Sequence, residues 1–112
     1  MENNYIPARG DIVWLDFDPR AGHEQAGKRP AIVISPKRYN AKVGLALFQP
    51  ITTKSKGYPF EVLLPQNLPI SGVILSDQIK SLDWQKRKIK YICTLPAKYY
   101  QEAIRKFQVL LK

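Results

Sequence analysis

The sequence predicts a mainly β fold: a small, strongly bent β-barrel or twisted sheet, closed by one C-terminal amphipathic helix. Many short apolar segments alternate with Gly- and Pro-rich punctuation, which is typical of short strands joined by turns. Only the C-terminal segment changes to the helical spacing of apolar residues. The chain has 112 residues, which predicts one domain over residues 1–112. Val, Ile, Leu and Phe account for 32 of them, enough for a packed core.

The first half of the chain alternates between apolar strands and polar connections. Residues 10–18 read GDIVWLDFD, which predicts a strand that is apolar on much of both faces. The polar segment 19–28 is long for a loop in so small a domain, and long loops are often functional. Residues 29–35 contain the β-branched run AIVIS, which indicates a buried strand. Residues 36–43 are expected to form a short helical turn.

The second half is expected to add further strands and the terminal helix. Residues 45–51 predict a strand, and Pro50 is expected to place its end at an edge or a bulge, because proline donates no ladder hydrogen bond. From Tyr100 to Leu111, apolar residues recur at helical spacing; Thr94 is expected to cap this helix and Pro96 to fit its first turn. The remaining short strands are expected at residues 59–64, 73–75, 79–84 and 89–94.

Composition excludes several classes of function. The net charge of +9 is spread over both halves of the chain, which indicates a polyanionic partner, either nucleic acid or an acidic protein. One Cys excludes an intramolecular disulfide and a thiolate zinc cluster, and one His excludes a two-histidine metal site or acid–base pair within one chain. The longest apolar runs have four residues, against about twenty for a membrane helix. The start has no apolar signal-peptide core, so we expect a cytoplasmic protein.

Two polar loops carry the residues most suited to chemistry. The first places His23, Glu24, Gln25, Lys28 and Arg29 together at the start of a strand, where ionisable groups shift each other's pKa and transfer protons. The alternative is a solvated loop with local salt bridges. The second loop, residues 52–58, contains hydroxyl and ammonium groups that bind phosphate oxygens, although ordinary turn hydrogen bonding would also explain them. The candidates in this loop are Thr52, Thr53, Lys54, Ser55 and Lys56.

Further candidates lie near these loops. Asp77 and Gln78 follow a short strand, where they are placed either to read base edges or to complete a turn. Tyr58 is the better candidate for stacking on a base, whereas Trp14 and Trp84 occur in strand patterns and are expected in the core. Cys93 is expected to be a buried, inert thiol. The basic turn QKRK and Lys90 are either a solvated turn or a docking surface for RNA or an acidic partner: residues 85–88 and 90.

Four segments in this order and spacing closely resemble the MazF/PemK/Kid toxins of bacterial toxin–antitoxin systems. They are GDIVWLDFDP, AGHEQAGKRPAIVISP, PITTKSKGYPFEV and SDQIKSLDW. The resemblance implies a small SH3-like β-barrel that forms a homodimer. It implies a sequence-specific ribonuclease of single-stranded mRNA that needs no metal or cofactor and inhibits translation and growth. The 2′-hydroxyl of the RNA attacks the adjacent phosphate, leaving a 2′,3′-cyclic phosphate and a 5′-hydroxyl, and an acidic antitoxin blocks the site.

The resemblance also assigns roles residue by residue. Arg29 of GKRP and Thr52, the first Thr of the TT pair, match the family's catalytic pair. Glu24 matches a Glu required in some members, and His23 matches a His of the plasmid-borne branch. Asp77 matches an Asp linked to base contacts or, in the plasmid branch, to catalysis. That branch has an Arg two residues before this Asp, where this chain has Leu75, so the Arg29–Thr52 scheme is favoured.

Some questions remain open at this level. Glu24 or His23 is the candidate base, and Arg29 or His23 is the candidate acid. Two other functions are compatible with such a basic domain: a non-catalytic toxin of the same fold that poisons DNA gyrase, and a basic RNA-binding module. The residues expected to bind RNA are Gln25, Lys28, Thr53, Lys54, Lys56, Tyr58, Asp77 and Gln78.

Overall fold

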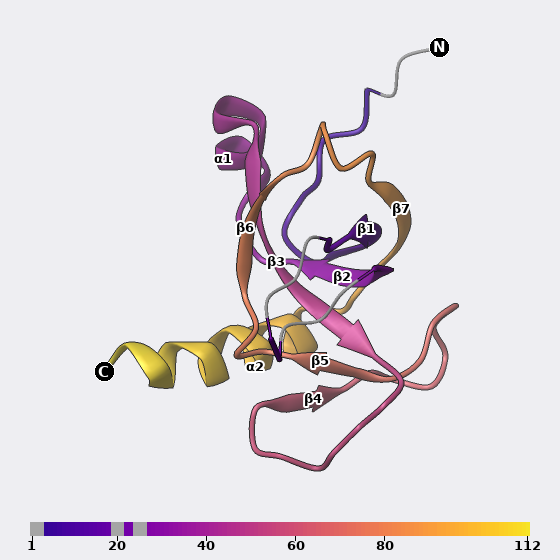
Figure 1. Cartoon of the computed structure of the whole chain (residues 1–112), viewed down its shortest axis with the longest axis vertical. Helices are drawn as coiled ribbons and strands as arrows, with labels where there is room; N and C mark the ends of the chain where they lie inside the picture. Colours follow the sequence, from indigo (N-terminus) through magenta and orange to yellow (C-terminus); the bar gives the residue numbers. More distant parts are fainter. Residues whose placement is uncertain (1–3, 19–21, 24–26) are drawn as a thin grey trace.

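A computed structural model describes residues 4–18, 22–23 and 27–112, and in this part of the chain seven antiparallel strands form one bent sheet. Helix α2 lies across one side of this sheet, and the C-terminal end of the chain projects beyond it (Figure 1). The mainly β class with a terminal helix is therefore confirmed. The elements are β1 (Asp11–Asp16), β2 (Lys28–Val33), α1 (Lys37–Val43), β3 (Leu45–Thr52), β4 (Glu61–Leu63), β5 (Val73–Leu75), β6 (Lys80–Asp83), β7 (Lys90–Thr94), α2 (Ala97–Gln108) and the 3-10 turn η1 (Val109–Leu111).

Strand β3 is the centre of the sheet. The order is β4-β5-β3-β2-β1-β7, with β6 also pairing with β3, so the pairings of the described strands form a bent sheet rather than a closed ring. One edge of β3 pairs first with β6 through Leu45–Phe48 and then with β5 through Ile51 and Thr52. Pro50 lies between these two ladders. We expected Pro50 at an edge or a bulge, but it lies inside the central strand β3, at the break between its pairings with β6 and β5. Proline has no backbone N–H to donate, and this break is a position where a strand tolerates that loss.

Strand alternation divides the core into two clusters, one on each side of the sheet. Ile12, Ile32 and Ile51 point to one side, where Leu95 and Ala103 from the α2 region complete the cluster. The opposite side buries Val13, Leu15, Ala31, Val33 and Phe48 with Trp84. Both faces of β1 and β2 are thus apolar, as the run of hydrophobic residues predicts.

A buried polar hub fixes helix α1 against the sheet. Asn40 is fully buried; its amide nitrogen donates to Pro7 O at 2.8 Å and Ser35 O at 3.1 Å, and its oxygen accepts from Ser35 Oγ at 2.5 Å. The indole N–H of Trp84 donates to Asn40 O at 3.0 Å. One asparagine therefore joins the N-terminal segment, α1 and the end of β6.

Two expectations about single residues are wrong. Trp14 is 44% exposed, because it lies on the face of β1 that the core does not cover at that end. Thr94 does not cap α2: it is the last residue of β7, its hydroxyl donates to Asp11 Oδ1 at 3.3 Å, and Pro96 is the N-cap.

Trp84 is buried as expected, and Cys93 is half-buried, which raises the pKa of its thiol. Across the described residues, no helix is long and apolar enough to cross a membrane.

Candidate functional site

Arg29 and Thr52 lie on neighbouring strands at the same end of the sheet. The β2–β3 register pairs Val33 with Phe48 and Ala31 with Pro50. Continuing the same register by two residues along each strand places Arg29 across from Thr52. Side chains two residues apart on a strand share a face, so both leave the sheet on the side of Ala31. The register thus directs the two residues that the resemblance joins to one face of the sheet, although they are 23 positions apart in the sequence.

Thr52 is held on a rigid support. Its side chain is almost buried, and its Oγ1 accepts a hydrogen bond from the Lys54 N–H at 3.1 Å. Its backbone pairs with Val73 of β5, and Gly72 passes directly behind it. Arg29 is half-buried opposite Leu15. A permanently charged guanidinium and a hydroxyl are therefore supported by the core at this end of the sheet.

The loop between β3 and β4 is folded around one carboxylate. Glu61, the first residue of β4, accepts hydrogen bonds from Ser55 Oγ at 2.6 Å, Lys56 N at 2.8 Å and Gly57 N at 3.1 Å. These bonds, with the Ser55 hydroxyl first, lower the pKa of the Glu61 carboxyl. Lys54 and Lys56 are exposed on this loop, as expected for phosphate contacts, and so is Thr53. Sequence reasoning missed Glu61. The only signal was an acid two residues after Pro59 in the GYPFEV motif.

Tyr58 and Asp77 form one hydrogen-bonded pair beside this loop. The Tyr58 hydroxyl donates to Asp77 Oδ1 at 2.5 Å, and both residues are half-buried. Burial first, and then the bond to Asp77, raise the pKa of Tyr58 far above its ordinary value, so the phenol stays protonated; Gln78 also bonds the phenol and acts in the opposite direction. The structure thus joins three residues that were predicted independently. The Tyr58 hydroxyl is engaged within the protein, which restricts how the ring can turn.

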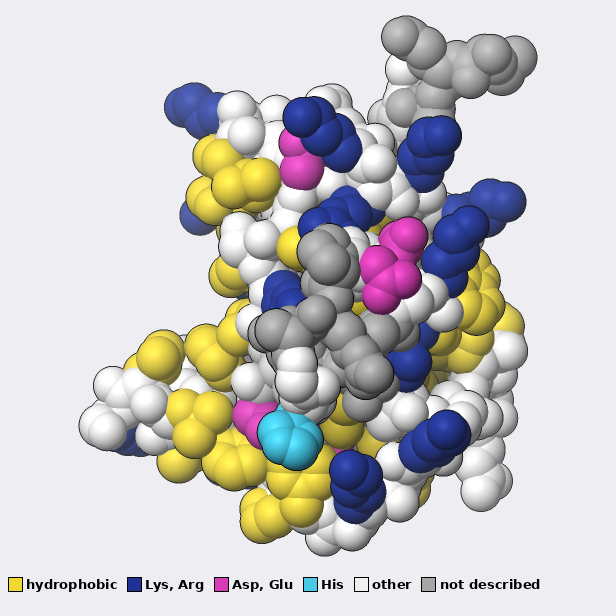
Figure 2. All heavy atoms as spheres, in the orientation of Figure 1, with side chains coloured by type: hydrophobic (Ala, Val, Ile, Leu, Met, Phe, Trp, Pro, Cys, Tyr) yellow, Lys and Arg dark blue, Asp and Glu magenta, His cyan; other side chains and the backbone are white. Residues whose placement is uncertain are grey.

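The first polar loop is anchored at its base. The Gly27 N–H donates to Asp18 Oδ1 at 2.9 Å, and Arg87 Nη1 donates to Asp16 O at 2.8 Å and Asp18 O at 2.5 Å. His23 is exposed, on the face shown in Figure 2. Lys28 is exposed at the start of β2. The expected Glu24 and Gln25 lie outside the described residues.

A basic cleft lies next to this anchor. It has a volume of about 660 Å³, and the exposed Trp14 lines it together with five cationic side chains. Asp16 and Asp18 are also in its wall, so the lining keeps an excess of positive charge. Figure 2 shows that Lys and Arg side chains are spread widely over this view of the molecule. The basic turn of the sequence is therefore part of a hollow surface. The cations are Lys28, Lys86, Arg87, Lys88 and Lys90.

The described residues bring no three His, Cys, Asp or Glu side chains close enough together to hold a metal ion. The chemistry available at the Arg29–Thr52 end of the sheet is electrostatic and hydrogen-bonding: a fixed cation, a hydroxyl and nearby lysines. Such groups stabilise negative charge that develops on a phosphate.

The sequence is similar to those of known proteins. The profile of the PemK-like, MazF-like toxins of type II toxin–antitoxin systems matches residues 8–111. The endoribonuclease toxin MazF of Escherichia coli K12 is 54% identical over 87 residues, which cover 78% of each chain. The endoribonuclease toxin ChpB of the same strain is 34% identical over 112 residues, or 93% of each chain.

Solved structures show the same fold. The crystal structure of MazF (Form-I) from Deinococcus radiodurans superposes with a TM-score of 0.94 at 48% identity, covering 96% of this chain and 98% of the other. A MazE–MazF structure (Form-II) from the same organism superposes with a TM-score of 0.85 at 42% identity, covering 96% and 97%. The β-sheet and the C-terminal helix are thus shared with these proteins over nearly their whole length.

Proposed function

The chain belongs to the PemK-like, MazF-like toxins of type II toxin–antitoxin systems, and from that premise we propose that Arg29 and Thr52 together activate a phosphodiester of single-stranded RNA. The chain is an endoribonuclease toxin that an antitoxin neutralises. Among the three candidate functions, RNA cleavage is therefore favoured over poisoning of DNA gyrase and over RNA binding without cleavage. The observation that carries the proposal is the β2–β3 register, which directs both side chains to one face of the sheet.

The proposed reaction is an internal transfer within the RNA. The 2′-oxygen forms a bond to phosphorus while the bond from phosphorus to the 5′-oxygen breaks, leaving a 2′,3′-cyclic phosphate and a 5′-hydroxyl. The 2′-hydroxyl proton goes to a base, and a proton is delivered to the departing 5′-oxygen. Negative charge grows on the non-bridging oxygens, where the planar donors of Arg29 and the hydroxyl of Thr52 stabilise it.

The proton-transfer roles fall to the first polar loop. Glu24 or His23 takes the proton from the 2′-hydroxyl, and His23 or Arg29 supplies the proton to the leaving oxygen. Arg29 is the weaker acid of these two because a delocalised guanidinium gives up its proton far less readily than an imidazolium. The anchor that Arg87 and Asp18 form at the base of the loop supports this assignment, since it ties the loop to the end of β1.

The second loop and the Tyr58–Asp77 pair are proposed to hold the bases and phosphates that flank the cut. Lys54 and Lys56 are exposed cations, and Thr53 adds a hydroxyl. Asp77 and Gln78 sit beside Tyr58, where polar groups and a ring face a base together. Gln25 and Lys28 are proposed to contact RNA from the first loop.

Cleavage of a defined RNA in EDTA tests the proposal. The purified chain is expected to cut single-stranded RNA and to leave cyclic-phosphate ends. Arg29→Ala is expected to lower the rate about 100- to 1000-fold, the usual effect of removing one donor from a developing oxyanion. The matched control is Arg38→Ala, which removes an exposed arginine from α1. Full activity of a folded Arg29→Ala variant would refute the site.

The antitoxin is proposed to be acidic and to cover the two RNA-binding loops. The net charge of +9 supports an acidic partner, because charge complementarity speeds association. Titrating the toxin with its antitoxin is expected to abolish cleavage at equimolar sites. A tight complex that still cuts RNA at the full rate would contradict this binding mode.

We also propose a cytoplasmic homodimer. The apolar residues at the C-terminal end of the chain support association, since Val109 and Leu110 are about half exposed and Leu111 is 71% exposed. Analytical ultracentrifugation at micromolar concentration is expected to give twice the chain mass. A mass of 12.9 kDa under those conditions would rule the dimer out.

A further inference from the structure

We propose that Glu61 is the positioning residue of the RNA-binding loop 53–58, and that its carboxylate folds the loop before RNA arrives. The inference rests on the proposed function, in which the exposed Lys54 and Lys56 of this loop contact RNA phosphates. Its claim is separate: Glu61 touches no RNA and acts by holding the backbone that carries these lysines.

The hydrogen bonds at Glu61 use both carboxylate oxygens. One oxygen accepts from Ser55 Oγ at 2.6 Å and Gly57 N at 3.1 Å, and the other accepts from Lys56 N at 2.8 Å. An ionised carboxylate is an acceptor only, so it suits three converging donors. Three consecutive residues of the loop are thus held by one side chain. The loop start is held separately, since the Lys54 N–H donates to Thr52 Oγ1 at 3.1 Å.

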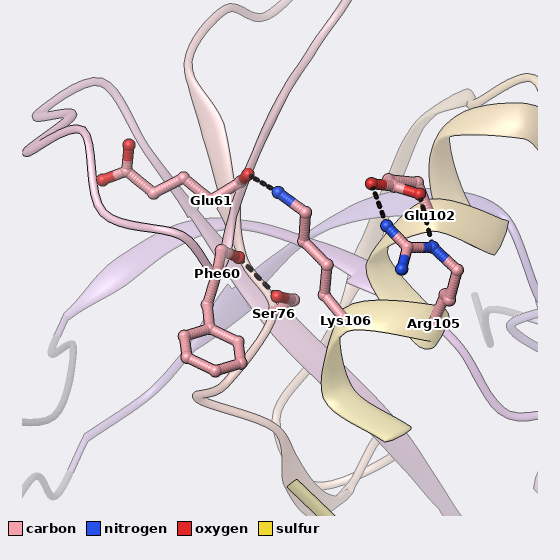
Figure 3. Close-up of polar contacts among 6 residues, drawn as sticks. All are labelled: Phe60, Glu61, Ser76, Glu102, Arg105 and Lys106. Atoms are coloured by element: carbon pink, nitrogen blue, oxygen red, sulfur yellow. Dashed lines mark hydrogen bonds and ion pairs between the residues drawn. The ribbon is translucent and has the colours of Figure 1, made fainter. Parts of the chain in front are cut away.

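Glu61 itself stands on a rigid base. It pairs with Leu75 of β5 in the sheet, and its carbonyl oxygen accepts from Lys106 Nζ of α2 at 2.8 Å. Figure 3 shows this contact and shows the Glu61 side chain directed away from the helix. The neighbouring Phe60 carbonyl accepts from Ser76 Oγ. The carboxylate is therefore presented from a strand that both the sheet and the helix hold, as an effective positioning group requires.

The negative charge of Glu61 makes it possible to distinguish a positioning role from a purely electrostatic effect on RNA binding. A carboxylate beside Lys56 reduces the positive potential that attracts RNA, so by charge alone Glu61 weakens binding. If Glu61 organises the loop, removing its charge loosens the loop and weakens binding instead. The two explanations therefore predict opposite changes in KM when the carboxylate becomes an amide.

Glu61→Gln is the test variant because it keeps the size of the side chain. The amide group has one accepting oxygen, and its NH₂ faces a donor, so at least one backbone N–H of the loop loses its partner. Two long lysine side chains and their backbone must then be ordered during binding, which costs roughly tenfold in affinity. We expect KM for a short single-stranded RNA to rise about tenfold, with kcat within twofold of wild type.

The matched control is Glu102→Gln. Glu102 is a surface carboxylate of α2 that pairs with Arg105 at 2.7 Å, and Figure 3 shows this pair on the helix. The substitution makes the same change in net charge away from the loop and is expected to leave KM within twofold. Ser55→Ala is the second variant: it keeps the charge, removes the 2.6 Å bond, and is expected to raise KM in the same direction by a smaller factor.

Amide hydrogen exchange gives a direct readout of the loop. The amides of Lys56 and Gly57 are expected to be protected in the wild type and in Glu102→Gln, and to exchange faster in Glu61→Gln. An unchanged or lower KM for Glu61→Gln, while Lys56→Ala raises KM, would overturn the role of Glu61 alone. An unchanged KM for Lys56→Ala would overturn the RNA-binding role of the loop, and this inference with it.

Discussion

Gly72 controls the position of Thr52, and a single methyl group tests this. Gly72 has φ of +126°, and its backbone passes behind the end of β3. A Cβ at residue 72 would lie 2.3 Å from Thr52 O and 2.8 Å from Thr52 C. Ordinary contact begins at 3.4 Å, so one of the two backbones must shift by about 1 Å (3.4 − 2.3). Gly72 O is held by the Leu64 N–H at 3.0 Å and the next residue, Val73, pairs with Thr52, so a shift on either side of this contact disturbs the ladder that positions Thr52.

The size of the effect follows from that displacement. A misplacement of about 1 Å at a reacting group costs on the order of 100-fold in rate. The positive φ adds backbone strain of about 1–3 kcal/mol for a residue with a side chain. We therefore expect Gly72→Ala to lower kcat about 100-fold and to lower the free energy of unfolding by a few kcal/mol.

The assay combines cleavage of a fluorogenic RNA with urea unfolding, so that loss of activity is measured on folded protein. Gly44→Ala is the matched control: Gly44 has φ of +81° at the end of α1, and its added Cβ would meet no atom within 4 Å. It is expected to lose about 1 kcal/mol of stability and to keep its activity. A folded Gly72→Ala variant that cuts RNA within threefold of the wild-type rate would refute the reasoning.

Three further predictions follow from single contacts. Arg29→Lys, assayed as cleavage rate, is expected to remain at least about tenfold slower than wild type, because an ammonium lacks the planar pair of donors; wild-type activity would show that charge alone suffices. Asn40→Ala removes a buried side-chain amide with three hydrogen bonds and is expected to cost about 3 kcal/mol in urea unfolding, whereas a loss under 1 kcal/mol would disagree. Hydrogen bonds hold the pKa of Glu61 below its ordinary 4.5, so the carboxylate stabilises the folded loop above that pH and loses this effect as pH falls through the lowered pKa. The protection of the Gly57 amide, measured against the unfolded chain at the same pH, should therefore be kept at pH 4.5 and lost only in more acid solution; loss of protection already at pH 5 would contradict it.

Local patterns predicted most of the secondary structure because they depend on neighbouring residues. Strand alternation and β-branched runs marked β1 to β3, and helical spacing marked α2. The two wrong predictions, for Trp14 and Thr94, concern residues whose environment depends on segments far away in the sequence. Trp14 has the sequence context of a core residue, yet it is 44% exposed and lines the basic cleft at its end of β1. Thr94 has the chemistry of a cap, yet pairing with Asp11 keeps it in β7.

In the candidate site too, residue types were predicted from the sequence, whereas contacts between distant segments were not. The resemblance assigned Arg29 and Thr52, and charge indicated an anionic partner, because residue types and their order carry this information. Glu61 has no local signature, since its three donors become its partners only when the loop folds back onto β4. The Tyr58–Asp77 bond joins residues 19 positions apart and likewise needs the sheet to bring them together.

By itself, the sequence determined the fold class and the family, because side-chain type and periodicity are local properties, and it predicted the chemistry that we propose for the two polar loops. Tertiary structure alone decided which groups meet. Register between β2 and β3 directs Arg29 and Thr52 to one face, and the absence of a side chain at Gly72 lets β5 approach Thr52 closely. Both depend on contacts between strands far apart in the chain, where a one-residue slip would turn every side chain to the opposite face.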